Sequence, residues 1–152
     1  MREFFSFTIA DEFFALPLCS IETVVRSVEL VRLPDAAPEL LGLLDLRGTM
    51  VPVISIHARL NLPSSPSTVD QRIVVASTEG RRVAFFADSV ESVQTIEEEA
   101  LIDSEAIYPG MDHYVKAIIW EGERKILYCD PDQFLSVDVS CLTSPIALDN
   151  GD

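Results

Sequence analysis

The chain has few of the residues from which enzymes build active sites. Its 152 residues include three cysteines, two histidines and six glycines. The cysteines, Cys19, Cys129 and Cys141, are odd in number and far apart, which argues against a disulfide framework or a C-x-x-C zinc site. The histidines lack H-x-x-x-H spacing, and the glycines form neither G-x-G-x-x-G nor a P-loop. We therefore expect no metal, no cofactor and no enzymatic activity.

Basic residues and long apolar runs are also scarce. The chain has 11 Lys and Arg against 25 Asp and Glu, a net charge of −14. Residues 77–152 carry 16 of the acids and only five of the bases. This potential disfavours binding to nucleic acid and to anionic membranes. No apolar run reaches the roughly 18 residues of a membrane span, and the first residues do not resemble a secretory signal. The expectation is a cytoplasmic protein.

What the sequence does contain is a repeat. "SIETV" (20–24) returns as "SVESV" (89–93), 69 positions later, and each follows an apolar strand–turn–strand pattern. A second block, 40–60, matches 114–134 at an offset of 74, which places Gly48 on Gly122 and Arg47 on Glu121. Two matching blocks in the same order indicate an internal duplication.

Many short strands with turn signals and little helix predict an all-β fold. Each half reads as five strands and a closing helical turn, so we expect two small barrels, one from each half. A barrel of about 65 residues is marginal alone, so the halves should share a hydrophobic seam. The expected domain covers residues 1–138: a first half at about 3–62, a linker at about 63–70 and a second half at about 71–138. A tail, 139–152, follows. In the second connector, Thr95 and Glu98 could cap one helical turn.

Two acidic residues and one arginine attract attention as possible site residues. Asp130 and Asp132 are better explained by a helix that starts after a strand, with Asp130 as N-cap and Pro131 in the first turn. Arg47 stands beside Gly48 between two apolar strands. It could anchor the turn through backbone carbonyls or a neighbouring acid. Alternatively, it could lie at the seam and present a partner-binding surface. The residues alone leave both readings open.

The stretch "LLGLLDLRGTMVPVISIHARLNL" (40–62) resembles the G-V-x-N-L-R-G-x-x-[VI]-P-[VI]-[VI]-D-L core of the CheW family. These adaptors couple chemoreceptors to the histidine kinase CheA. Segments 4–18, 81–96 and 123–135 are similar to the family's opening hairpin, its G-x-x-V-D-x-V-x-x-V segment and its closing strand and helix. The resemblance covers roughly residues 3–136. It implies two SH3-like five-stranded barrels around a hydrophobic junction.

The resemblance also implies a function and a set of partner-binding residues. The function is a non-enzymatic adaptor that binds the regulatory domain of a CheA-type kinase and the cytoplasmic tip of a chemoreceptor. A receptor tip is a helical hairpin, which an apolar seam could hold in a groove. The implied binding residues are Arg47, Asp45, Leu46, Gly48, Ile21, Val24, Phe85 and Ala87.

Four residues depart from the family pattern: Asp45, Thr23, Ser55 and His57. They alter the charge near the expected docking face and raise a question about the partners. One alternative is therefore a divergent spacer or antagonist that binds only kinase regulatory or CheW-like domains. A second, from another class, is a small-molecule-binding or enzymatic β-barrel that uses Cys19 or His57.

Overall fold

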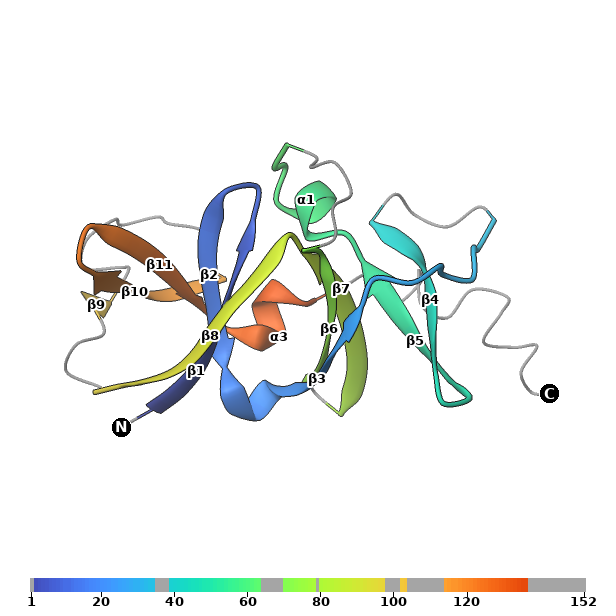
Figure 1. The fold of residues 1–152 in the computed structure, drawn as a ribbon, viewed down its shortest axis with the longest axis horizontal. Helices are drawn as coiled ribbons and strands as arrows, with labels where there is room; N and C mark the ends of the chain where they lie inside the picture. The colour runs from blue at the N-terminus through green and yellow to red at the C-terminus, as the bar shows by residue number, and fades with distance from the viewer. Residues whose placement is uncertain are drawn as a thin grey trace.

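The computed structural model describes residues 2–34, 39–63, 70–78, 80–97, 102–103 and 114–136. Its strands form two sheets that curl into small barrels lying side by side (Figure 1). Barrel A has the strand order β8-β1-β2-β11-β10-β9, and barrel B has the order β3-β6-β7-β5-β4. The predicted all-β architecture of two small barrels is confirmed.

The strands are short and the helices are single turns. Barrel A contains β1 (Arg2–Ile9), β2 (Glu12–Pro17), β8 (Ser89–Ile96), β9 (Ile102–Asp103), β10 (Val115–Glu121) and β11 (Arg124–Cys129). Barrel B contains β3 (Ile21–Arg26), β4 (Leu40–Leu46), β5 (Thr49–Ile54), β6 (Arg72–Thr78) and β7 (Arg81–Ala87). The helical turns are η1 (Leu18–Ser20), α1 (Ile56–Arg59) and α3 (Pro131–Phe134).

The closing helical turns lie where the sequence predicted them. Asp130 is the N-cap of α3, its side chain accepts the Asp132 N–H, and Pro131 occupies the first turn. The helical turn expected from Thr95 does not start there, because Thr95 belongs to strand β8. Glu98, most of the linker and the tail 139–152 lie outside the described residues.

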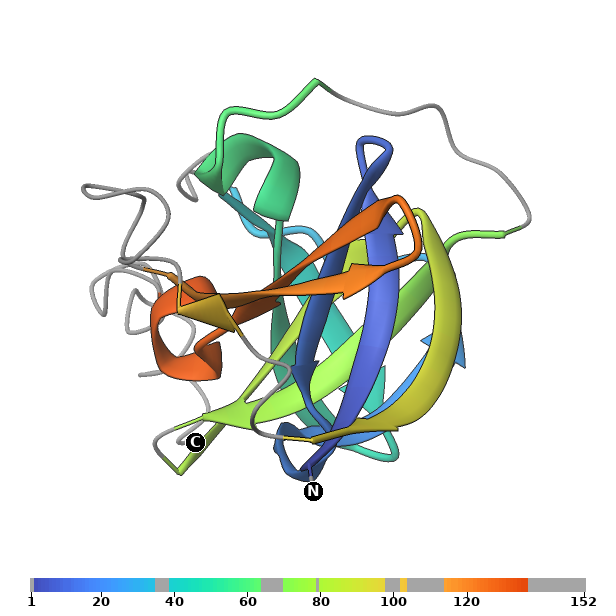
Figure 2. The ribbon, with the colours of Figure 1, turned by 90° about the vertical axis from the view of Figure 1, so that its left-hand side faces the viewer.

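Each barrel contains strands from both halves of the sequence, which corrects the expectation of one barrel per half. The β1–β2 hairpin of the first half lies in barrel A, between β8 and β11 of the second half (Figure 2). Reciprocally, the β6–β7 hairpin of the second half lies in barrel B, between β3 and β5 of the first half. The halves have therefore exchanged their opening hairpins.

The strand pairings of the first half recur at equivalent positions of the second half. In the opening hairpins, Phe7 pairs with Phe14, and Ala76 with Val83, at the predicted offset of 69. In both barrels the last hairpin strand pairs parallel to the exchanged hairpin. The two barrels are thus built by the same rules, which supports the inferred duplication.

The closing hairpins correct the second offset by one residue. Leu40 pairs with Ile54, and Val115 with Cys129, so equivalent positions are 75 apart and not 74. The structural counterpart of Arg47 is therefore Gly122 and not Glu121. A glycine can occupy either position of a two-residue turn, so aligning glycine on glycine misplaced the block by one residue.

A hydrophobic cluster between the barrels is the centre of the molecule. Phe7, Phe14, Phe85 and Phe134 are each at most 2% exposed, and their ring centroids lie 5.1–6.1 Å apart. Figure 1 shows α3, which carries Phe134, between the two barrels. Burying each phenylalanine contributes roughly 2–3 kcal/mol. The predicted hydrophobic seam is confirmed, and side chains from both barrels fill it.

Barrel B depends on one glycine where the chain returns to β4. Val31 and Leu43 exchange two backbone hydrogen bonds of 2.9 Å, which join the β3–β4 connector to β4. Gly42, next to this bridge, has a φ of +155°, and a Cβ there would lie 2.6 Å from the Val31 carbonyl oxygen. Only glycine lets the two backbones approach this closely.

Replacing Gly42 with alanine should therefore lower the free energy of unfolding by roughly 2–4 kcal/mol, through overpacking and backbone strain. Gly80→Ala is the matched control, because Gly80 also has a positive φ of +79° but nothing within 4 Å of its Cβ position. It should lose only about 1–2 kcal/mol. Urea unfolding measures both. Equal losses would mean that the Val31 contact does not require glycine.

Candidate partner-binding surface

The Arg47–Gly48 turn projects from the tip of the β4–β5 hairpin. Leu46 pairs with Thr49, so Arg47 and Gly48 form a two-residue turn. Their φ values are +54° and +87°, the left-handed pair of a type I′ turn. Glycine adopts this conformation freely, whereas arginine does so at a cost of about 1 kcal/mol. A strained residue at an exposed tip is a reason to look for function there.

The sequence left two predictions open for Arg47, an anchor of the turn and a residue at the seam. The structure fits neither in full, because the hairpin tip lies at the end of barrel B away from barrel A (Figure 1). Asp45 holds the turn, because its Oδ1 accepts the Gly48 N–H at 2.8 Å. The Arg47 side chain is exposed. Within the described part of the chain it makes no hydrogen bond or ion pair. Asp45 thus does the anchoring that was considered for Arg47, and the guanidinium group is available to a partner.

An apolar surface adjoins this turn on the outside of barrel B. Leu43 lies between Val31 on one side and Pro52 on the other, and Asp45 pairs with Met50 in the next row. Val31 and Met50 are each 48% exposed, and Leu41 is 40% exposed. We call Val31, Leu41, Leu43, Met50 and Pro52 the β4–β5 face. Exposed apolar side chains grouped in this way typically mark a protein-binding site.

The β4–β5 face was not among the binding residues predicted from the sequence. The signal was present in the segment "LLGLLDL" (40–46), which has leucines at both odd and even positions. Because successive side chains of a strand point to opposite faces, some of these leucines must point away from the core. Leucine on both faces of a strand predicts either burial on both sides or an interface. Here one side of the strand is exposed.

Ile21 and Val24 lie on β3, which is an edge strand of the barrel B sheet. Both are half-buried and pack against the central cluster. Immediately before β3, η1 borders a hollow of about 470 Å³, which is lined by Arg2, Glu3, Pro17, Leu18, Cys19 and Tyr128. The short strand is therefore next to an accessible depression that the sequence did not reveal.

Phe85 and Ala87 do not belong to a binding surface. Both are 0% exposed and lie in the central cluster. Their strand, β7, has neighbours on both sides in the sheet, and the filled seam covers the face that carries these two residues. A partner therefore cannot touch them in this structure.

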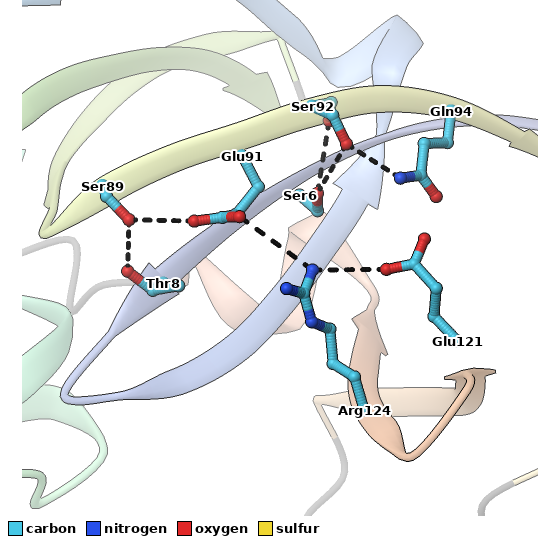
Figure 3. Close-up of polar contacts among 8 residues, drawn as sticks. All are labelled: Ser6, Thr8, Ser89, Glu91, Ser92, Gln94, Glu121 and Arg124. Atoms are coloured by element: carbon cyan, nitrogen blue, oxygen red, sulfur yellow. Dashed lines mark hydrogen bonds and ion pairs between the residues drawn. The ribbon is translucent and has the colours of Figure 1, made fainter.

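Polar side chains of β1, β8 and the β10–β11 hairpin lie close together in barrel A (Figure 3). Arg124 lies 3.2 Å from Glu121 and 3.9 Å from Glu91, and its guanidinium group stacks 4.2 Å above the Phe13 ring. Ser89 and Thr8 share a hydrogen bond of 2.7 Å across β8 and β1. Exposed pairs of this kind contribute little to stability. We interpret the Arg124 pairs as a solvated cluster at the surface.

The cysteines and His57 do not form a nucleophilic pair in the described structure. Burial raises the pKa of the Cys129 thiol well above its ordinary value, and the charge of Asp130 adds to the effect. Cys19 is exposed, and the Nε2 atom of His57 lies 3.4 Å from Asp88 Oδ2. Among the described residues, no cluster of His, Cys, Asp or Glu could hold a metal ion. His113 and Cys141 lie outside the described residues.

In a Cys19→Ser, Cys141→Ser variant, the remaining Cys129 should react with a thiol reagent at pH 8 at least about 100-fold more slowly in the native protein than in urea. The raised pKa keeps the thiol protonated, and burial blocks access to it. The control variant Cys129→Ser, Cys141→Ser leaves the exposed Cys19, which should react at a similar rate in both states. Fast native labelling of Cys129 would contradict its burial.

The CheW-like domain model matches residues 3–139. The chain belongs to the CheW family. The "Chemotaxis protein CheW" of Bacillus subtilis is 24% identical over 88% of this chain and 86% of that protein. The protein of the same name from Thermotoga maritima is 26% identical over 88% and 87%.

Solved structures support the same fold for this CheW-family chain. The crystal structure of the scaffolding protein TtCheW from Thermoanaerobacter tengcongensis matches with a TM-score of 0.80 at 21% identity, over 90% of this chain and 89% of that one. In the described residues, no helix has the length and apolar character needed to cross a membrane.

Proposed function

We propose that this CheW-family chain is a non-enzymatic, cytoplasmic adaptor that joins a CheA-type histidine kinase to the cytoplasmic tip of a chemoreceptor. The observation that carries the proposal is the family match over residues 3–139, together with an exposed apolar face beside an unengaged arginine. The relatives are named chemotaxis proteins, and TtCheW is described as a scaffolding protein.

The β4–β5 face is the proposed docking surface for the kinase regulatory domain. Its centre is apolar, and Asp45 and Arg47 provide a polar rim at one end. This combination is typical of protein interfaces, in which an apolar core is surrounded by polar residues. Asp45 and Gly48 shape the turn, and Arg47 is the residue that we expect to contact the partner directly.

The receptor tip is proposed to bind at the start of β3. Ile21 and Val24 are half-buried there, and Leu18 and Cys19, which line the hollow, belong to the η1 turn directly before β3. A helix can place apolar side chains at a spacing of three to four residues into such a depression. Because the central seam is filled, the helix would lie on the surface of the molecule and not between the barrels.

Arg47→Ala should weaken binding to the kinase regulatory domain by at least about tenfold, because an interface arginine often contributes 2 kcal/mol or more. Folding stability should not change, since Arg47 has no partner within the described residues. Arg47→Gly should weaken binding equally but raise the free energy of unfolding by about 1 kcal/mol, because glycine removes the left-handed strain. Calorimetric titration and urea unfolding measure the two effects.

Arg81→Ala is the matched control, since it removes an exposed arginine from the β6–β7 hairpin of the same barrel. It should leave kinase binding unchanged. Normal binding by both Arg47 variants would remove Arg47 from the interface. Loss of stability in Arg47→Ala would instead support a structural role.

Met50→Glu tests the apolar face itself. A carboxylate in the apolar face, directly opposite Asp45, should abolish binding to the kinase regulatory domain, while the fold tolerates it because Met50 is 48% exposed. Val93→Glu is the control, because Val93 is 52% exposed but lies in barrel A. Pull-down against the kinase domain and against a receptor tip should show selective loss of the kinase. Equal loss in both variants would contradict the assignment.

One observation favours a second candidate, a spacer that binds only CheW-like domains. The equivalents of Asp45 and Met50 in barrel A are Trp120 and Lys125, which also pair across a hairpin. Trp120 is 53% exposed. Both barrels therefore carry an exposed apolar residue paired with a charged one near the hairpin end, Met50 with Asp45 and Trp120 with Lys125. A chain that binds the kinase domain but no receptor tip would be such a spacer.

A further inference from the structure

Ser136, the last residue that the structure describes, is fastened to the α1 turn. Arg59 of α1 donates to the Ser136 Oγ at 2.8 Å and to the Gln133 carbonyl oxygen at 2.6 Å. α1 follows β5 directly, and the Ser55 N–H between them donates at 2.7 Å to the carbonyl oxygen of Glu39, just before β4. The chain therefore leaves the described structure near the base of the β4–β5 hairpin.

The segment that follows, 137–152, lies outside the described residues, and its composition indicates that it has apolar surface to bury. Seven of its 16 residues are apolar, close to the 48% of the whole chain, and it has three aspartates but no lysine or arginine. Solvated tails are typically poor in apolar residues. The larger apolar residues of the segment are Val137, Val139, Leu142, Ile146 and Leu148. Such a segment gains free energy when it covers an apolar surface.

The β4–β5 face is an apolar surface within reach of this segment. Four of the six large apolar side chains that are exposed in the described structure belong to barrel B and its β3–β4 connector: Val28, Val31, Leu41 and Met50. From Ile54 to Thr49 the hairpin rises about 17 Å. Residues 137–148 span up to about 40 Å when extended. The segment is therefore long enough to cover the face from its base to its tip.

The charges at the far end of the face and of the segment are complementary. Arg47 lies at the hairpin tip, beyond the apolar residues, and has no partner within the described residues. In the segment, Asp149 likewise follows the apolar residues. A segment that runs from the base of the hairpin towards its tip brings this carboxylate towards the guanidinium group, and such pairs form strong hydrogen bonds.

We propose that residues 137–148 pack along the β4–β5 face of their own chain and must leave it when the kinase regulatory domain docks there. The competition rests on the proposed function, whereas the packing of the segment does not. Because the segment and the face belong to one chain, their effective concentration is in the millimolar range, so even a weak contact is populated. The segment therefore lowers the affinity of the face for its partner by the fraction of time that it occupies the face.

Cys141 lies within the segment and is a native probe of where the segment packs. In the full chain with Cys19→Ser, the change Met50→Cys places a thiol on the β4–β5 face, while Cys129 is buried. Oxidation with diamide should join this thiol to Cys141 within one molecule at least about tenfold faster than in a Val93→Cys control, whose site in barrel A is similarly exposed. Equal rates would overturn the proposal. Cross-linked dimers in place of the intramolecular product would also overturn it and would assign the face to a second copy.

The double variant Leu142→Asn, Ile146→Asn tests the apolar contact in the full chain without adding charge. It should abolish the preference for the Met50→Cys site and raise the affinity for the kinase regulatory domain at least about threefold, because the face is no longer covered. Ser140→Asn, Ser144→Asn is the matched control in the same segment and should change neither. Unchanged kinase affinity in the first variant would overturn the competition. If the chain binds no kinase domain, the proposed function fails, and the cross-linking rates still decide whether the segment covers the face.

Discussion

The packing of aromatic rings between the barrels is the interaction on which the rest of the structure depends. Phe7 and Phe14 come from the hairpin that the first half contributes to barrel A, and Phe85 from the hairpin that the second half contributes to barrel B. Phe134, on α3, contacts all three rings. Because the hairpins are exchanged, neither half can complete a barrel alone, and the cluster forms only when both halves are present. The barrels are therefore two parts of one cooperative unit.

The sequence predicted the repeated strand pattern, the closing helical turns and the hydrophobic seam, because these follow from local alternation and capping residues. It did not predict the exchange of hairpins. Alternation identifies which side chains share a face of a strand, but it carries no information about which neighbouring strand completes the sheet. The sequence did not predict the burial of Phe85 and Ala87 for the same reason. Their exposure depends on which elements cover the hairpin after the exchange.

The proposed site illustrates how a duplicated fold acquires different surfaces. The strands pair in almost the same way in the two barrels, so packing in the core restricts which residues can occupy the inward positions of both. Outward positions and turn tips have no such constraint. At equivalent tips one barrel has Arg47 and the other has Gly122. Glycine is the residue that the turn geometry favours. Arginine at such a position is a local conflict with folding, and conflicts of this kind are expected at functional sites.

The departures from the family pattern can now be given physical roles. Asp45 accepts the Gly48 N–H, and Ser55 accepts the Ala58 N–H as the N-cap of α1. Both are oxygen acceptors that close a local turn. His57 lies against Asp88, and Thr23 is half-buried in β3 opposite Val75. Two of the four, Asp45 and Ser55, thus keep the neighbouring backbone in place. Because they do not remove the β4–β5 face or Arg47, they do not weigh against an ordinary kinase partner.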